Sequence, residues 1–341
     1  MRALSLVEDG RLELVRLPEP PPPGAGEVQV RMRAVALNHI DLWSLRGMAF
    51  AKRTLPIVAG VEGAGEILAV GPDVAGRKVG ERVAIYAGEV CGACRACREG
   101  RENLCEKIGG IMGFHHDGLA RERLNLPARR ALPVPTGVGL THAACAPVTF
   151  ATVQHMLFDN AKLEPGEWVL VQAGGSGIGS TAILMAKDIG ARVIATAGSA
   201  DKLARMQALG ADHVINYREE RFEGVVRRLT GKRGVDVVFE HVGPDTWPGS
   251  LLSLARGGRL VICGSTSGIS APTNLFHLFQ QQIRIIASFG ANFRNVAEGL
   301  AKMARGLQPV IDSEVPLDGM AEAIARLQRR EVFGKIVVTL D

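Results

Sequence analysis

The stretch Trp168-Val-Leu-Val-Gln-Ala-Gly-Gly-Ser-Gly-Ile-Gly179 decides the fold of this chain. Its apolar run Val169–Val171 is typical of a buried strand, and glycines follow at 174, 175, 177 and 179. Apolar residues at helical spacing then continue to Ile189. A helix that begins directly after a tight turn presents free N–H groups and its positive dipole end to an anion. The stretch therefore predicts a pyrophosphate-binding turn between a strand and a helix, although glycines also simply make turns.

Strand-like and helix-like segments alternate from this stretch to about residue 288. The predicted strands are Val169–Gln172, Arg192–Thr196, His213–Ile215, Val235–Glu240, Arg259–Cys263 and Ile283–Ser288. Predicted helices fill the gaps, at 178–189, 200–209, 219–230, 245–256 and 275–282. This alternation predicts an α/β unit, a doubly wound parallel sheet with helices on both faces. Such sheets bind their ligands at the carboxyl ends of the strands.

The flanking residues predict a second, mostly β domain. Its strands are expected at Met1–Val7, Arg11–Arg16, Val28–Ala36 and Gly63–Val70, with one or two helical turns over Asn38–Arg46. Residues 137–161 are predicted to be helical and to join the two domains. After residue 290 the pattern predicts two amphipathic helices, at 293–305 and 318–329, and a last strand, Lys335–Leu340.

Composition limits the classes of function. The 341 residues suggest two domains, and 47% hydrophobic with 22% charged residues is typical of a soluble globular protein. No apolar run reaches the ~18 residues of a membrane span, and no signal peptide is present, so we expect a cytoplasmic protein without a membrane partner. The net charge is +5, but the basic residues are scattered, so we expect no nucleic-acid partner.

Four of the six cysteines form the pattern Cys91-x2-Cys94-x2-Cys97-x7-Cys105. Four thiolates are the ligand set of a closed, tetrahedral structural zinc site. In a cytoplasmic chain this spacing favours metal over disulfides, the remaining alternative being four free cysteines. We predict one structural zinc ion per chain.

The end of the second predicted strand bears on the choice of cofactor. NAD-binding folds place an acidic residue about 20 residues beyond the glycine turn, whereas this chain has Ala195-Thr-Ala-Gly-Ser-Ala-Asp-Lys202. Ser199 and Lys202 are suited to the 2′-phosphate of NADPH, and Tyr217 to its other side. The alternatives are that Ser199 only caps a helix and that Tyr217 stacks on the sheet edge. We expect NADPH, with NADH as the alternative.

Two further segments carry a family resemblance, Val214-Ile-Asn-Tyr-Arg-Glu-Glu220 and Asp236-Val-Val-Phe-Glu-His-Val-Gly-Pro-Asp-Thr-Trp247. The chain resembles the medium-chain dehydrogenase/reductase superfamily over nearly its whole length, and within it the NADPH:quinone oxidoreductase (zeta-crystallin-like) branch. The resemblance implies a GroES-like catalytic domain, residues 1–149 and 291–341, and a Rossmann domain, residues 150–290. Residues 91–105 resemble the structural zinc lobe of the superfamily's alcohol dehydrogenases, which many quinone reductases lack. Ser176 replaces a usual glycine, and we expect the turn to remain intact.

The same resemblance implies that the active site has no catalytic zinc. The positions of the family's three zinc ligands match Asn38, Val61 and either Val148 or Thr149. Without a Lewis acid, the acceptor's own electronics must favour hydride addition. We therefore expect an NADPH-dependent oxidoreductase that transfers hydride to a quinone or to an activated C=C or carbonyl compound. The alternatives are a zinc-dependent alcohol dehydrogenase using NAD(P) and a non-catalytic NADPH-binding protein.

The resemblance also assigns individual residues. It places three polar side chains beside the nicotinamide: Asn38, Asp41 and Thr152. The residues it assigns to the cofactor are Gly174, Gly175, Ser176, Gly177, Ile178, Gly179, Ser199, Lys202, Tyr217, Val242, Gly264, Phe289 and Lys335. His39 and Tyr86 are candidate proton donors, and Trp43, Phe50 and Phe289 are candidate pocket walls. Besides a small-molecule substrate, we expect a second copy of the chain as partner, in a homodimer or homotetramer, because the sixth strand lies at a sheet edge.

Overall fold

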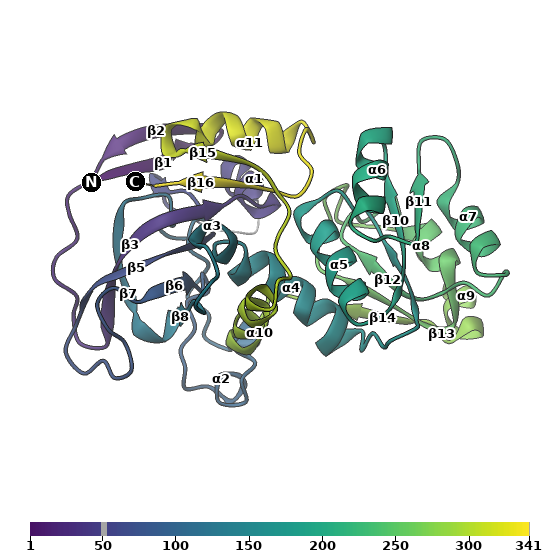
Figure 1. Cartoon of the computed structure of the whole chain (residues 1–341), viewed down its shortest axis with the longest axis horizontal. Helices are drawn as coiled ribbons and strands as arrows, with labels where there is room; N and C mark the ends of the chain where they lie inside the picture. The colour runs from purple at the N-terminus through teal and green to yellow at the C-terminus, as the bar shows by residue number, and fades with distance from the viewer. Residues whose placement is uncertain (49–52, 341) are drawn as a thin grey trace. The chain divides into compact units, whose positions relative to one another are not determined.

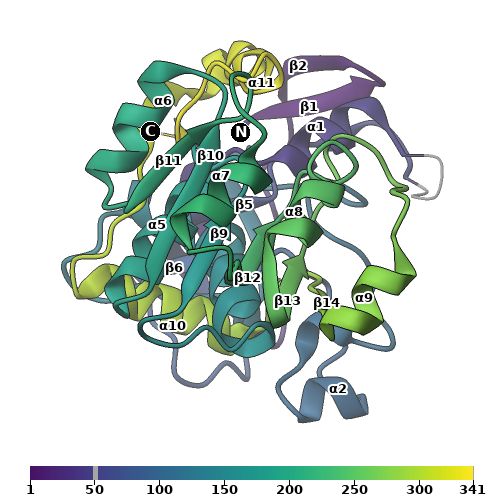
Figure 2. The same ribbon diagram turned by 90° about the vertical axis from the view of Figure 1, so that its right-hand side faces the viewer.

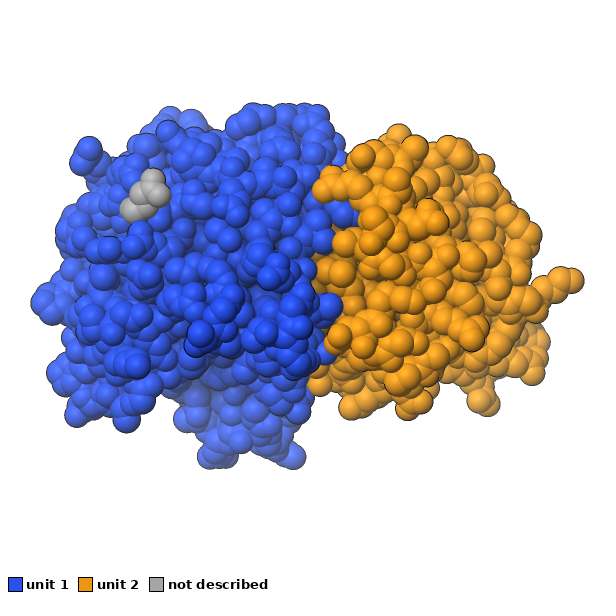
Figure 3. Space-filling model, viewed as in Figure 1, with its two compact units in different colours: residues 1–151, 291–341 blue, residues 152–290 orange. Residues whose placement is uncertain are grey.

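The computed structural model describes residues 1–48 and 53–340. The chain divides into two compact units, Met1–Ala151 with Ala291–Asp341, and Thr152–Gly290 (Figure 3). Residues 150 and 151 lie in the first unit, whereas the sequence analysis placed them in the second. None of the helices in the described residues is long and apolar enough to cross a membrane.

The first unit is built mainly of strands, which form two sheets in the described residues (Figure 1). One sheet has the order β15-β16-β3-β5-β6-β8, with β7 also paired to β3, and the other has the order β2-β1-β4. The strands are β1 (Arg2–Glu8), β2 (Arg11–Arg16), β3 (Glu27–Ala36), β4 (Ile57–Val58), β5 (Glu62–Val70), β6 (Arg82–Ile85), β7 (Arg123–Pro127), β8 (Ala131–Pro133), β15 (Ile311–Pro316) and β16 (Lys335–Thr339). The helical segments are α1 (His39–Arg46), α2 (Arg95–Arg98), η1 (Glu102–Leu104), η2 (Ala128–Arg130), α3 (Leu140–Ala143), η3 (Ala146–Phe150), α10 (Phe293–Ala304), η5 (Leu317–Gly319) and α11 (Met320–Gln328).

Strand β3 organises the first unit because alternate side chains enter the core. Val28, Val30 and Met32 are fully buried, as the period of two in a strand requires. The tail of the chain returns to this strand, since β16 pairs antiparallel with it and aligns Val338 with Val35. The return brings Lys335, the first residue of β16, into the same unit as α1.

The second unit holds one parallel sheet in the order β11-β10-β9-β12-β13-β14 (Figure 2). Its strands are β9 (Trp168–Val171), β10 (Arg192–Ala197), β11 (His213–Asn216), β12 (Val235–Glu240), β13 (Leu254–Ile262) and β14 (Arg284–Ala287). Its helical segments are η4 (His155–Asn160), α5 (Gly177–Asp188), α6 (Ala200–Ala208), α7 (Phe222–Leu229), α8 (Trp247–Ser253) and α9 (Leu275–Gln281), and α4 (Ala151–Gln154) spans the boundary with the first unit. Val169–Val171 are completely buried, as expected for a central strand covered on both faces. The strand order reverses beside β9, which places the ligand-binding crevice at the glycine turn.

One predicted helix end was wrong, and two features were not predicted. Residues 254–256 are strand rather than helix, because the backbone at Leu254 already pairs with Val235 of β12. The segment 137–161 is helical over most of its length, as predicted, but the π-helical turns η3 and η4 were not foreseen; Pro147 in η3 lacks the N–H that a regular helix needs. Strand β15 was not predicted, since its side chains are half-buried or exposed and show no apolar alternation.

Candidate active site

The glycine turn connects β9 to α5 as the sequence predicts. Ser176 is the N-cap of α5, and its Oγ accepts a hydrogen bond from the Gly179 N–H at 3.0 Å. A Cβ at position 179 would lie 2.4 Å from the carbonyl oxygen of Ala173, so only glycine fits there. The serine that replaces a usual glycine therefore stabilises the start of the helix. The turn leaves a backbone surface suited to the pyrophosphate of a dinucleotide.

A network of hydrogen bonds between buried polar side chains holds the backbone of this turn. The Thr196 hydroxyl donates to Gln172 Oε1 at 2.7 Å and accepts from the Ala173 N–H at 3.1 Å. Gln172 Nε2 donates to Ser250 Oγ at 3.0 Å, and Ser250 donates to Glu240 Oε2 at 2.6 Å. This polar network runs across the carboxyl ends of β10, β9 and β12. The sequence analysis missed it, although Gln172, Thr196 and Glu240 each lie at or next to the end of an apolar strand.

Glu240 links this polar network to Val242, a predicted cofactor contact. Its Oε1 accepts hydrogen bonds from the N–H groups of Val242 at 2.7 Å and Gly243 at 3.2 Å. The Glu240 side chain is completely buried, and Thr246 donates a further hydrogen bond to it. The carboxylate therefore fixes the turn that carries Val242.

The residues predicted to bind the 2′-phosphate gather after β10. Ser199 is the N-cap of α6 and accepts from the Lys202 N–H at 3.4 Å. A Cβ at Gly198 would lie 2.6 Å from the Tyr217 hydroxyl and 3.0 Å from Arg218 Nε. The side chains of Tyr217 and Arg218 thus lie against the backbone at Gly198. The sequence analysis did not predict a role for Arg218. Its position next to Tyr217 is the one signal that could have indicated it.

In the first unit, a buried ammonium group lies at the start of α1. Lys335 Nζ donates to the Leu37 carbonyl at 2.5 Å, to Asn38 Oδ1 at 2.8 Å and to Glu62 Oε2 at 3.0 Å. All three of its N–H groups are therefore used. Lys335 is 2% exposed and Glu62 is 0% exposed. The sequence analysis assigned Lys335 to the cofactor, and that contact stays a prediction.

Glu62 accepts hydrogen bonds from several further donors besides this ammonium. Its Oε1 accepts from the N–H groups of Val148 at 2.7 Å and Thr149 at 2.6 Å. These amides belong to the first turn of η3, whose N–H groups lack partners within the helix. Its Oε2 accepts from Asn38 Nδ2 at 2.9 Å and from the Thr149 hydroxyl at 3.0 Å. Asn38, Glu62, Thr149 and Lys335 are called the ammonium cluster below.

Asp41 lies on α1 one turn beyond Asn38 and is 4% exposed. Its Oδ2 accepts from the Asn38 N–H at 2.7 Å, whereas its buried Oδ1 has no hydrogen-bond partner in the described residues. Burial raises the pKa of Asp41 to about 7, against the opposing effects of the Asn38 hydrogen bond and Lys335. The side chain is thus a carboxyl group whose proton is exchanged near neutral pH.

We expect the free energy of unfolding to fall as pH rises from about 4 to about 7. Between the unfolded pKa of 3.8 and the folded pKa of about 7, the folded state binds the extra proton, so raising the pH destabilises it. Asp41→Asn keeps an oxygen for the Asn38 N–H and should flatten this part of the curve. Urea titrations across this pH range test the expectation. An unchanged slope in the variant would assign the pH dependence to other groups.

The remaining predicted residues are distributed between the two units. Thr152 is buried in α4, the Gly264 backbone lies near the His241 carbonyl, and Phe289 is 58% exposed. The Tyr86 hydroxyl is buried and donates to the Ala291 carbonyl at 2.8 Å, and burial raises the pKa of Tyr86. That hydroxyl is therefore not oriented as a proton donor to a substrate. His39 and Trp43 are half-buried in α1, and Phe50 lies outside the described residues.

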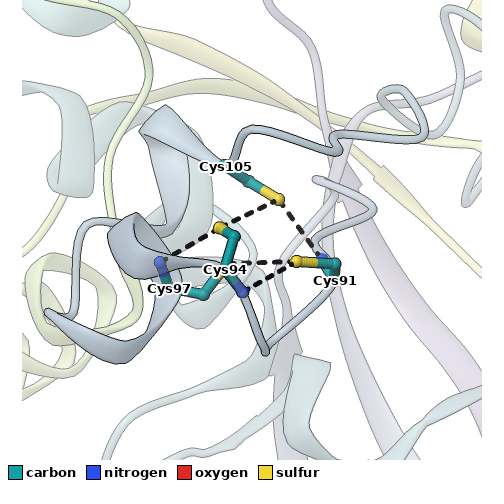
Figure 4. A group of neighbouring side chains, drawn as sticks. All are labelled: Cys91, Cys94, Cys97 and Cys105. Carbon is teal, nitrogen blue, oxygen red and sulfur yellow. Dashed lines mark hydrogen bonds between the residues drawn. The ribbon is translucent and has the colours of Figure 1, made fainter.

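The four predicted zinc ligands meet in one cluster (Figure 4). Their Sγ atoms all lie within 4.8 Å of one another, with Cys91–Cys97 and Cys94–Cys105 separations of 4.0 Å. Tetrahedral zinc with Zn–S bonds of about 2.3 Å separates its sulfurs by about 3.8 Å, so the cluster fits a structural zinc. Hydrogen bonds from the N–H groups of Ala93 and Cys94 lower the pKa of Cys91 to about 6, which favours the thiolate.

Two family models match the chain. Residues 24–136 match the alcohol dehydrogenase GroES-like domain, and residues 177–305 match the zinc-binding dehydrogenase model. A crystal structure described as an NAD-dependent alcohol dehydrogenase is 41% identical, with a TM-score of 0.94 and 100% of both chains covered. Acryloyl-coenzyme A reductase of Metallosphaera sedula is 32% identical, covering 95% of this chain and 96% of that protein. The chain belongs to the medium-chain dehydrogenase/reductase superfamily.

A further relative in the superfamily is the quinone oxidoreductase of Salmonella typhimurium, 33% identical over 77% of this chain and 72% of that protein. These matches confirm three predictions made from the sequence: membership of the superfamily, the GroES-like fold and the Rossmann fold. The protein is an NAD(P)H-dependent oxidoreductase of the zinc-binding dehydrogenase family. Its relatives include both reductases and alcohol dehydrogenases, so membership alone leaves the acceptor open.

Proposed function

We propose that the protein transfers hydride from NADPH to a quinone or to an activated C=C or carbonyl compound, without a catalytic zinc. The observation that carries the proposal is the ammonium cluster. Of the residues at the positions of the family's zinc ligands, Asn38 accepts a hydrogen bond from the Lys335 ammonium, and Thr149 donates to Asn38 and Glu62. Two of those positions, Asn38 and Thr149, belong to the cluster.

The chemistry of these side chains does not fit a catalytic zinc. Zinc sites use cysteine, histidine and carboxylate ligands, whereas the matching positions carry an amide, a hydroxyl and the buried apolar side chain of Val61. Glu62 is the one carboxylate in the cluster, and both of its oxygens already accept hydrogen bonds. In the described residues, the four cysteines are the only group of three or more His, Cys, Asp or Glu side chains close enough to share an ion.

Bound NADPH would supply the hydride. The glycine turn would hold its pyrophosphate, and the Glu240 hydrogen bonds would fix the backbone at Val242 beside it. The ammonium cluster holds Asn38, the N-cap of α1, through hydrogen bonds with Lys335 and Glu62. The acceptor must carry its own electron-withdrawing group, because no metal polarises it. Asp41 is the group in this region whose proton exchanges near neutral pH, and it is our candidate proton source for the reduced product.

A zinc-dependent alcohol dehydrogenase is the second candidate. It is favoured by the 41% identical structure, which is described as an NAD-dependent alcohol dehydrogenase. That function requires a catalytic metal and a second metal equivalent per chain.

A screen of cofactor oxidation separates the two candidates. Purified protein should oxidise NADPH in the presence of quinones, enals, enones or enoyl thioesters. It should not reduce NAD⁺ or NADP⁺ in the presence of simple alcohols, because no group would stabilise an alkoxide. Robust alcohol oxidation would reject the proposal. The absence of turnover with every acceptor would favour a non-catalytic NADPH-binding protein.

The choice of NADPH rests on Ser199, Lys202, Tyr217 and Arg218. Lys202→Ala should weaken NADPH binding about tenfold to a hundredfold, because a charge-assisted hydrogen bond contributes roughly 1.5–3 kcal/mol and tenfold is about 1.4 kcal/mol. NADH affinity should change little, and the NADPH effect should shrink as salt rises. Fluorescence titrations with both cofactors check this, with Arg256→Ala, an exposed cation on β13, as the matched control. Equal losses for NADH and NADPH would refute the preference.

We also propose that a second copy of the chain covers the edge strand β14. In the described residues no strand pairs with its outer side, and Ile285 is 40% exposed. Helix α9 follows β13 and exposes Leu275, Phe276 and Phe279, each by more than 60%. Light scattering at micromolar concentration should give at least a dimer mass, and Phe279→Glu should shift it towards the monomer. A monomeric wild type would refute this.

A further inference from the structure

His241 is a buried histidine of the second unit that has no role in the site described so far. It follows β12 directly and is 6% exposed. Its Nε2 lies 2.8 Å from the carbonyl oxygen of Gln172, and because a carbonyl only accepts, Nε2 must carry the proton. Gln172 follows β9 directly, and β9 and β12 are neighbours in the sheet. The imidazole therefore joins the carboxyl ends of two adjacent strands.

The other ring nitrogen of His241, Nδ1, keeps a free lone pair. Burial lowers the pKa of His241, against the opposing effects of the Glu240 charge and the Gln172 hydrogen bond, so the imidazole is neutral at pH 7. With the proton on Nε2, Nδ1 can only accept a hydrogen bond. It has no partner in the described residues and is accessible to solvent rather than enclosed. A donor from outside the chain can therefore reach it.

The backbone groups next to this imidazole are already used within the protein. The Val242 N–H donates to Glu240 Oε1 at 2.7 Å, and the Val242 carbonyl accepts from the N–H and the hydroxyl of Ser267, both at 2.8 Å. The Gln172 carbonyl accepts from His241 itself. These groups are thus unavailable to a ligand, whereas Nδ1 of His241 is available.

The order of the strand ends matches the order of the parts of a dinucleotide. The residues predicted for the 2′-phosphate follow β10, the predicted pyrophosphate turn follows β9, and Val242 follows β12, and these three strands are neighbours in that order. In a nicotinamide dinucleotide the second ribose lies between the pyrophosphate and the nicotinamide. A group that joins the β9 end to the β12 end is therefore placed beside this ribose. Gly264, another predicted cofactor contact, packs here as well, since a Cβ on it would lie 3.2 Å from the His241 carbonyl.

We propose that His241 Nδ1 accepts a hydrogen bond from a hydroxyl of the ribose next to the nicotinamide, and so positions the hydride-donating end of the cofactor. The placement of the dinucleotide along these strand ends rests on the proposed function. Since this ribose is common to NADPH and NADH, the role of His241 does not depend on the choice between them.

Binding titrations with ADP, ADP-ribose and NADH test this contact without turnover. ADP ends at the pyrophosphate, ADP-ribose adds the second ribose, and NADH adds the nicotinamide. His241→Gln keeps an Nε2 donor for the Gln172 carbonyl but removes the Nδ1 acceptor. It should raise the dissociation constants of ADP-ribose and NADH about tenfold and leave that of ADP unchanged. His213→Gln, a matched change of an exposed histidine at the amino end of β11, should alter none of the three.

His241→Asn is the reciprocal variant, because its Oδ1 is bonded to Cγ as Nδ1 is, while nothing replaces the Nε2 donor. It should bind ADP-ribose more tightly than His241→Gln does. Equal losses for ADP and ADP-ribose in His241→Gln would show a general disturbance of the turn and overturn the proposal. A loss confined to NADH, or unchanged affinities for all three ligands, would overturn it as well. If the wild type reduces no acceptor, the proposed function fails, whereas these titrations still decide the role of His241.

Discussion

Lys335→Met should lower the free energy of unfolding by about 3–5 kcal/mol, as expected when one partner of a buried ion pair is removed. The reason is that Glu62 is 0% exposed and would keep a charge without a counterion. The hydrogen bonds from Val148, Thr149 and Asn38 would remain, but none of them carries a positive charge. Urea unfolding followed by fluorescence and circular dichroism measures the loss.

The double variant Glu62→Gln/Lys335→Met is the matched control. It removes both charges, so it should be more stable than Lys335→Met alone. Measuring Glu62→Gln as well completes the cycle, and the double-variant change minus both single-variant changes gives the coupling between the two charges. A single variant that loses less than about 1 kcal/mol would contradict a central role for the ammonium cluster. Equal losses in the single and double variants would contradict a charge effect.

Cys94→Ser should abolish zinc binding at the cysteine cluster and lower the thermal stability of the protein substantially. Structural zinc contributes folding free energy directly, about 10–16 kcal/mol in small zinc-finger peptides. Hydride transfer itself should persist, although the variant will denature at a lower temperature.

Cys263→Ser is the matched control for this experiment. Cys263 is a free cysteine of the second unit that lies outside the zinc cluster. Its variant should retain one zinc and nearly the wild-type melting temperature. A Cys94→Ser protein that keeps a full equivalent of zinc at the cluster would contradict the assignment.

The α/β unit was predictable because its strands are continuous buried runs. Val169–Val171 is apolar and buried on both faces, and Val235–Glu240 is buried except at Asp236, as expected of covered parallel strands. Their boundaries were less predictable. Leu254 and its neighbours carry helix-compatible side chains, and only the pairing of Leu254 with Val235 makes them a strand. The cysteine cluster was predictable from spacing alone, since all its ligands lie within one short loop.

The polar clusters could not be predicted from the sequence because their members are distant from one another in the chain. Lys335 and Glu62 are 273 residues apart, and only the return of β16 to β3 brings them together. The amides of Val148 and Thr149 reach Glu62 because η3 is a π-helical turn, which no local pattern indicated. Arg218 and the Gln172–Glu240 chain depend in the same way on the order of neighbouring strands.

The most direct test of hydride transfer without a catalytic zinc is the zinc content of a sample whose NADPH-dependent reduction of an enone or enoyl thioester is measured in parallel. We expect one zinc per chain in fully active protein, and measurable reduction by Cys94→Ser protein that contains none. Two zinc equivalents per chain, or activity that disappears when a second zinc is removed while the cysteine cluster stays loaded, would contradict it.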